Sequence, residues 1–448
     1  MSRRADPLER QIEATLEPDR FVSDRACFSF VCDLEEVEGE VARLVETEPT
    51  RAVAVYQAFL AGCYEKAEEL DDSSGSFGMF VTELFCGWIR ARQAAGADPE
   101  ETAVRLLAWM DDDPYGFCHR LEHDVVKVLD KAGRAAFTEQ VRTRFEQASQ
   151  AASTSDDGGR SARADRRRWA EVLRTLYLAR RSITAYIQLA EDTGVTAQDC
   201  HAVATMLAAR RKPGQALSWV ERGIELDKQA RHGSAAGRDL AKLELRLLER
   251  LGREDDAIAK VWTAYRERPS RYTYDDLLEV VPKAERRSWH EKAMAAAMGA
   301  DLRSLIELLV HTKETERVAD VVRRSTDEAL EGVGHDAAQE AAKRLEKGHA
   351  DAAARLWRSR AMRILTAKKS KYYGAALQSL ERARRCYEQT GLATQWQQLV
   401  SDVRAEHHRK TSFMPGFEKL VRGAGPSQEP SFLERAKARW VVPHQPPR

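Results

Sequence analysis

The chain has 448 residues, more than one compact hydrophobic core usually holds, so we expect two or three domains or one elongated array. Hydrophobic residues make up 43% and charged residues 32%, and the formal net charge of +0 favours no particular class of partner. The polar N-terminus has no apolar run before a cleavage site, and no stretch of about 18 apolar residues occurs, so we expect neither a signal peptide nor a membrane span.

The seven cysteines are scattered through helical patterns, and no Cys-x-x-Cys pair occurs among them. An odd number of cysteines without a disulfide framework is typical of reduced thiols. We therefore expect a cytoplasmic protein.

Helical periodicity recurs along nearly the whole chain, and the alternation typical of strands is absent. Residues 24–47 predict a helix pair around Gly39, and Pro49 opens a helix that reaches Leu70. Ala, Leu, Arg and Glu, which are strong helix formers, dominate the composition. The sequence predicts an all-α protein with more than about 65% helix.

Further along, three positions predict helix starts. Ser76 can cap the helix that follows the turn at 71–75. Asp98-Pro99 places a capping aspartate before a proline at the first helical position, and Asp113-Pro114 repeats the pattern. We expect a helix after each of them.

Residues 148–165 are small and polar and show no helical period, so we interpret them as a flexible linker. This divides the chain into an N-terminal helical domain over 1–147, the linker, a helical-repeat region over 166–410 and a C-terminal helical cap and tail over 411–448.

A short motif repeats after this linker. It reads as a helix, a polar turn and a second helix that opens with alanine and an apolar residue, and the four alanines are Ala216, Ala257, Ala353 and Ala376. A small residue there allows two helices to approach closely, and one such pair cannot bury its apolar stripe alone. We predict an α-solenoid of stacked antiparallel helix pairs, divisible into two helical subdomains.

Five segments together carry a family resemblance: Asp71–Gly78, Asp112–Phe117, Arg168–Leu173, Ala216–Gly223 and Glu406–Met414. With them the chain resembles an uncharacterised group of bacterial tetratricopeptide-like helical-repeat proteins, whose members are often found downstream of a SWIM zinc finger. The resemblance implies a helical-repeat fold and no particular activity. The Cys-x-Cys and Cys-x-His halves of such a finger are absent from this chain, because Cys27 and Cys32 are too far apart and Cys118-His119 too close.

The sharpest chemical motif is His119-Arg-Leu-Glu122-His123, the His-x-x-Glu-His pattern of inverted zinc peptidases. On a helix the two histidines would share one face and could hold a metal, with Glu122 as the base. Such peptidases also need an α/β framework, which this sequence does not predict. The alternative is an ordinary helix with surface or half-buried histidines, and we expect no metal. No glycine-rich phosphate loop or nucleophile elbow occurs, so we expect no catalytic residue and no cofactor.

Charge is distributed unevenly along the chain. Residues 33–72 contain twelve acidic and three basic residues, whereas residues 355–385 contain ten basic residues and one acidic residue. Such a basic stretch could bind the phosphates of a nucleic acid, dock on an acidic protein surface, or form a solvated helix face. The candidate binding-surface residues are Arg355, Arg358, Arg363, Lys368, Lys369, Lys371, Arg384 and Arg385.

We interpret the chain as a non-enzymatic helical-repeat scaffold that binds an unidentified protein partner and no membrane, because stacked helix pairs present long surfaces to extended partners. One alternative is a nucleic-acid-associated protein that uses the basic 355–385 stretch. Another is a metal-dependent hydrolase at His119, Glu122 and His123. The sequence does not indicate an oligomeric state.

Overall fold

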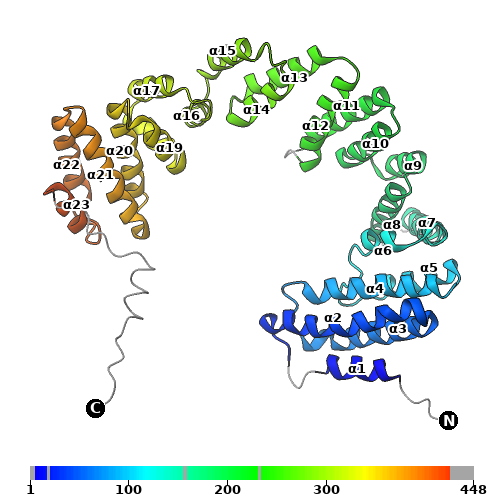
Figure 1. The fold of residues 1–448 in the computed structure, drawn as a ribbon. Helices are drawn as coiled ribbons and strands as arrows, with labels where there is room; N and C mark the ends of the chain where they lie inside the picture. The colour runs from blue at the N-terminus through cyan, green and yellow to red at the C-terminus, as the bar shows by residue number, and fades with distance from the viewer. Residues whose placement is uncertain (1–5, 18–20, 155–158, 231–233, 424–448) are drawn as a thin grey trace, which may run out of the picture. The chain divides into compact units, whose positions relative to one another are not determined.

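The computed structural model describes residues 6–17, 21–154, 159–230 and 234–423, and 81% of these residues are helical. Within this described part no strand occurs, apart from an isolated bridge between Val22 and Leu70. The predicted all-α fold class, an α-solenoid of stacked antiparallel helix pairs, is confirmed. No helix of the described ranges is both long enough and apolar enough to span a bilayer. The chain divides into two compact units, Met1–Leu251 and Gly252–Arg448, coloured along the chain in Figure 1.

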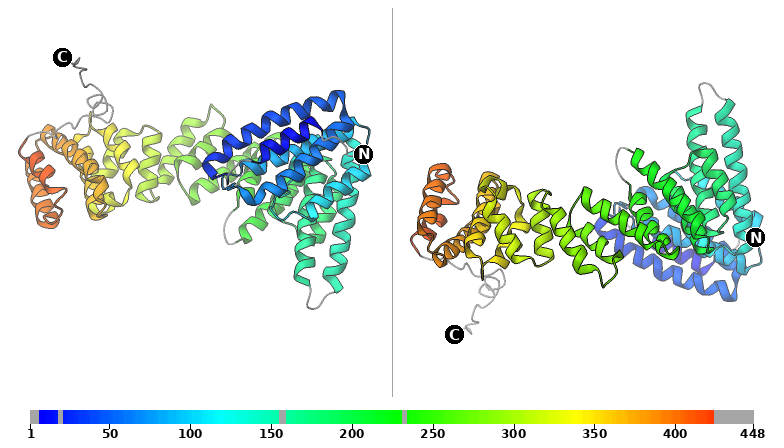
Figure 2. Two further views of the ribbon diagram at one scale, coloured as in Figure 1. Left: turned by 90° about the horizontal axis from the view of Figure 1, so that it is seen from below. Right: turned by 90° about the horizontal axis from the view of Figure 1, so that it is seen from above.

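The first unit contains twelve of the described α-helices. They are α1 (Pro7–Leu16), α2 (Asp24–Thr47), α3 (Pro49–Lys66), α4 (Ser76–Ala94), α5 (Pro99–Asp111), α6 (Glu122–Val128), α7 (Lys131–Thr154), α8 (Gly159–Ala179), α9 (Ile183–Thr193), α10 (Ala197–Ala209), α11 (Pro213–Gln229) and α12 (Ala235–Arg250), with a 3-10 turn at Ala67–Glu69 after α3. Helices α1 to α4 lie in layers around an apolar core, and α7 and α8 run side by side (Figures 1 and 2).

The second unit contains the remaining eleven described α-helices. They are α13 (Glu254–Glu267), α14 (Arg271–Val280), α15 (Arg286–Ala297), α16 (Leu302–His311), α17 (Thr315–Arg324), α18 (Asp327–Gly332), α19 (His335–Leu345), α20 (Ala350–Thr366), α21 (Tyr373–Gln389), α22 (Ala393–His407) and α23 (Met414–Val421), with a 3-10 turn at Ser370–Tyr372 before α21. Helix α20 packs on α17, α18, α19 and α21.

The interpretation of 148–165 as a linker is corrected by the helices that occupy most of it. Helix α7 continues to Thr154 and α8 begins at Gly159, while residues 155–158 lie outside the described residues. The two helices pack on each other, and the division between the compact units falls after Leu251 instead. Alanine and arginine favour helix strongly enough to extend both helices through a polar sequence.

The repeated alanines share one structural position. Ala216, Ala257, Ala353 and Ala376 are each the fourth residue of their helix, in α11, α13, α20 and α21 respectively. Each is buried, with at most 2% of its surface exposed. A methyl group at this point allows the second helix of a pair to approach the first, which is the packing that the repeat predicts.

Two predicted helix starts are confirmed, whereas the predicted helix pair over 24–47 and the predicted helix after Asp113 are wrong. Helix α3 begins at Pro49, and the Asp98 side chain accepts a hydrogen bond from the Glu100 amide at the start of α5. Residues 24–47 form one continuous helix instead of a pair, because Gly39 lies within a long amphipathic face and causes no break. No helix follows Asp113 directly; the chain forms turns up to the start of α6 at Glu122.

A close helix contact in the first unit gives a stability prediction. Gly87 of α4 packs directly on the ring of Tyr56 in α3, and the Tyr56 hydroxyl donates a 2.7 Å hydrogen bond to Glu38 of α2. A methyl group at position 87 would overlap with this fixed ring, so we expect Gly87→Ala to lower the free energy of unfolding by about 1–3 kcal/mol. Gly39 has no heavy atom near its vacant Cβ position, and Gly39→Ala should instead stabilise by about 0.5–1 kcal/mol. Urea denaturation of both variants checks these opposite signs.

Candidate functional site

A cleft of about 740 Å³ opens in the first unit, between the turns that connect α5 to α6 and the helices α8 and α10. All three residues of the His-x-x-Glu-His motif line it. The full lining is Met110, Asp111, Asp113, Gly116, Cys118, His119, Arg120, Glu122, His123, Arg168, Glu171, Val172, Arg174, Thr175, Leu178, Tyr186, Gln198 and Ala202. The cleft therefore presents both charged and apolar side chains.

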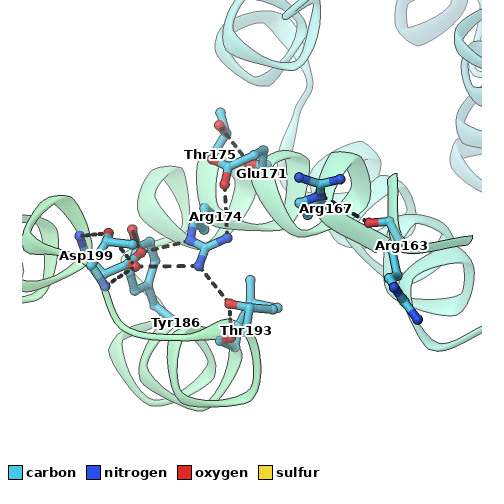
Figure 3. A network of polar contacts seen from close by, with 10 residues as sticks. Arg163, Arg167, Glu171, Arg174, Thr175, Tyr186, Thr193 and Asp199 are labelled. Carbon is cyan, nitrogen blue, oxygen red and sulfur yellow. Dashed lines mark hydrogen bonds and ion pairs between the residues drawn. The ribbon is translucent and has the colours of Figure 1, made fainter. Parts of the chain in front are cut away.

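One wall of the cleft is held by a buried ion pair between helices α8 and α10 (Figure 3). Arg174 Nε lies 2.8 Å from Asp199 Oδ1, and the two side chains are 12% and 2% exposed. Arg174 Nη2 also donates to the Thr193 hydroxyl of α9 over 2.7 Å, and the Tyr186 hydroxyl donates to Asp199 Oδ1 over 3.0 Å. Three successive helices are thus fixed to one another through one guanidinium and one carboxylate.

Asp199 also caps its own helix. The Thr196 hydroxyl accepts a hydrogen bond from the Asp199 amide, and Asp199 Oδ2 accepts one from the Thr196 amide, which forms a reciprocal capping box. Burial acts to raise the pKa of Asp199, but hydrogen bonds from Arg174 and Thr196 outweigh it and hold the pKa below its usual value. The carboxylate therefore stays charged at neutral pH in an almost inaccessible position.

The opposite wall is a compact turn organised by Asp113. Its carboxylate accepts hydrogen bonds from the amides of Phe117 and Cys118, at 3.0 and 2.7 Å, and from the Tyr64 hydroxyl at 3.1 Å. Burial raises the pKa of Cys118 to about 12, so this thiol is not a ready nucleophile. The Asp113 carboxylate oxygens accept hydrogen bonds from the backbone of the turn, and these bonds fix the shape of the wall.

The structure places His119, Glu122 and His123 together but not as a metal-binding helix face. Arg120 adopts a left-handed backbone conformation, with φ 59°, and α6 begins only at Glu122, so His119 lies on a turn. The prediction that both histidines lie on one helix is therefore wrong. Glu122 is buried, and its Oε1 lies 3.5 Å from His123 Nε2. Across the described ranges, no group of three or more His, Cys, Asp or Glu side chains is arranged to hold a metal ion.

The basic 355–385 stretch lies in the second unit, where Arg355 and Arg363 of α20 contact the C-terminal ends of neighbouring helices. Arg355 donates to the carbonyl oxygens of Val322 and Ser325 at the end of α17, at 2.6 and 2.7 Å, and pairs with Asp327 at 2.8 Å. Arg358 pairs with the same carboxylate. Arg363 donates to the carbonyl oxygens of Glu331 and Gly332 at the end of α18, at 2.9 and 3.1 Å. A cation suits a helix C-terminus because the unpaired carbonyl groups there carry partial negative charge.

The arginines of α21 also have partners within the unit. Arg384 donates to the Leu420 carbonyl oxygen at the end of α23 over 2.6 Å and pairs with Glu388, and Arg385 pairs with Glu381. Lys368, Lys369 and Lys371 are exposed in the turn before α21, where Lys371 lies over the Tyr372 ring. Four of the eight candidate basic residues thus join helices to one another, whereas Arg385 pairs within α21 and the three lysines are exposed.

Comparison with known proteins gives one family and solved structures of low similarity. No curated protein matches the chain. Among solved structures, Naa15/Naa10 bound to HypK-THB is 13% identical, with 98% of this chain and 74% of that chain covered and a TM-score of 0.26. A circular tandem repeat protein is 13% identical over 93% and 98%, with a TM-score of 0.20. The APC/C hetero-tetramer Cut9-Hcn1 is 10% identical over 92% and 90%, with a TM-score of 0.19. A family model matches residues 7–415, so the chain belongs to the family of unknown function DUF6880.

Proposed function

We propose that this protein is a non-enzymatic helical-repeat scaffold whose first unit binds a segment of a partner protein. The observation that carries the proposal is the 740 Å³ cleft, whose walls are fixed by the Arg174–Asp199 pair on one side and by Asp113 on the other. A site that is already rigid loses little conformational entropy when a partner binds. The seven free thiols suit a reducing compartment, so we place the protein in the cytoplasm.

The lining supports recognition of a peptide. Its acidic side chains have partners within the protein: Asp111 pairs with Arg144 at 2.9 Å and Glu171 with Arg174 at 3.1 Å. Leu178 presents an apolar side chain that is 38% exposed at the cleft. Fixed polar groups around an accessible apolar surface are typical of sites that bind side chains of a partner.

A matched pair of glutamines tests this proposal. Gln198 is exposed and lines the cleft, whereas Gln188 is exposed on the neighbouring helix α9 and does not line it. A photo-crosslinking amino acid at position 198 is expected to capture a defined protein in cells that carry this chain, and the same group at position 188 should not. The captured protein, once purified, should bind the wild-type chain in isothermal titration calorimetry, and Leu178→Asp should weaken that binding about tenfold or more.

Two results would contradict the proposal. One is an identical set of crosslinked proteins, or none, from positions 198 and 188. The other is unchanged affinity of the purified partner for Leu178→Asp when circular dichroism shows that the variant is folded.

A further inference from the structure

Two successive helix turns in the first unit carry adjacent arginines. The turn between α8 and α9 holds Arg180 and Arg181, and the turn between α10 and α11 holds Arg210, Arg211 and Lys212, all of them exposed. The turns touch, because Arg210 Nη2 donates a 2.7 Å hydrogen bond to the Arg181 carbonyl oxygen. The basic side chains therefore lie along one edge of the helix stack.

The second of these turns separates two clefts. One, of about 680 Å³, is lined by Arg211 together with Arg246 and Arg250 of α12, over apolar residues that include Leu243 and Leu247. The other, of about 400 Å³, is lined by Arg210 and Lys212 over apolar residues that include Ile183 and Ile187 of α9. We name them the α12 cleft and the α9 cleft. Each combines an apolar floor with a basic rim.

The charge of these rims is not balanced by the residues that line the clefts. Neither lining, as far as the described residues define it, contains an aspartate or a glutamate. Glu249 follows closely on Arg246 in α12 but lies outside both linings. Trp219 lines the α9 cleft, and Arg222 lies over its ring, with 5.0 Å between the guanidinium carbon and the ring centroid. An approaching ligand therefore meets a positive field above apolar surface.

We infer that the α12 cleft and the α9 cleft bind an acidic peptide segment of a partner protein. Carboxylates of the segment would pair with Arg211, Arg246 and Arg210, whose guanidinium groups can each donate two hydrogen bonds to a carboxylate. Apolar side chains of the same segment would occupy the aliphatic floors. Single-stranded nucleic acid fits less well, because its bases bind best on aromatic platforms and these floors are mainly Leu, Ile and Ala. The inference rests on the proposed scaffold function, for which it names the chemistry of the partner.

The test uses the full chain and a short synthetic peptide of alternating glutamate and leucine that carries a fluorophore. We expect binding by fluorescence anisotropy at low salt, and loss of most of it when every glutamate of the peptide is replaced by glutamine. Arg246→Glu should weaken binding about tenfold or more, because it introduces a like charge beside the bound carboxylates. Arg238→Glu is the matched control, since Arg238 is an exposed arginine of the same helix outside the clefts, and it should change the affinity about twofold at most.

Three outcomes would overturn the inference. They are equal binding of the glutamine peptide, equal weakening by Arg238→Glu and Arg246→Glu, and tighter binding of an oligothymidine that Arg246→Glu abolishes, which would make the ligand a nucleic acid. Failure here is distinguishable from failure of the scaffold proposal. A partner captured through position 198 that binds Arg246→Glu as tightly as wild type contradicts only the inference about the clefts.

Discussion

Replacing Arg174 by methionine is expected to lower the free energy of unfolding of the first unit by about 3–5 kcal/mol, because Asp199 would keep its charge in a buried position without its partner. Methionine fills much of the same volume, so the loss reports mainly the ion pair. Urea denaturation followed by circular dichroism measures the change, and hydrogen exchange in α8 to α10 assigns the transition to this unit. Arg167, on the same helix, is exposed and donates only a 3.3 Å hydrogen bond to the Arg163 carbonyl oxygen (Figure 3). Arg167→Met should change stability by less than about 0.5 kcal/mol.

The same substitution has an expected pH dependence. The folded protein holds the pKa of Asp199 below its usual value, so in the wild type this carboxylate contributes stability above the unfolded pKa of about 4. That contribution is lost as the pH falls through the lower, folded pKa. In Arg174→Met the cation that pairs with the Asp199 carboxylate is absent. Protonation of Asp199 then removes an unpaired buried charge, so the variant loses less stability at low pH. The difference in free energy of unfolding between the variant and the wild type should therefore decrease from pH 7 towards pH 4. A difference that does not change with pH would contradict the assigned role of the ion pair.

Arg355→Lys is expected to lower the free energy of unfolding of the second unit by about 2–3 kcal/mol, although it conserves the charge. The guanidinium of Arg355 reaches carbonyl oxygens at the end of α17 and the Asp327 carboxylate at once. An ammonium group is a point donor and cannot span these acceptors. Chemical denaturation, with hydrogen exchange in α17 and α20, measures the loss.

Arg385→Lys is the matched control for this substitution. Arg385 is 67% exposed and pairs with Glu381 one helical turn away, so the change should cost less than about 0.5 kcal/mol. Equal stability of the two variants would show that Arg355 does not hold α17 and α20 together. Both variants keep the net charge of the 355–385 stretch. A difference in stability between them therefore reports the hydrogen bonds of Arg355 and not the surface charge.

Local sequence patterns predicted the positions of several helices correctly. Proline at Pro49 and the Asp98-Pro99 pair mark real starts, because capping and a fixed φ angle act within one helical turn. The repeated alanines likewise occupy one buried position in four helices. Helix starts and repeated contact positions depend on neighbouring residues in the sequence, so they can be predicted without the tertiary structure.

The cleft in the first unit could be predicted only in part. The His-x-x-Glu-His run does line it, yet the left-handed Arg120 and the late start of α6 remove the helix that the motif suggested. Asp113-Pro114 predicts a helix start, whereas the Asp113 carboxylate caps the amides of a turn. The ion pair of Arg174 and Asp199 gave no sequence signal, because the two residues lie 25 positions apart on different helices.

Helix propensity, capping and composition are local properties, so the residue pattern alone predicts the all-helical fold, its repeated small contact residue and the location of its basic stretch. The partners of the arginines depend instead on how the helices pack. Arg355, Arg363 and Arg384 donate to carbonyl oxygens at the ends of α17, α18 and α23. Charge counting cannot detect such partners, because every residue has a carbonyl group and only packing of one helix end against another helix exposes it to a guanidinium. The packing of successive turns likewise decided that the unbalanced arginines surround the α12 and α9 clefts.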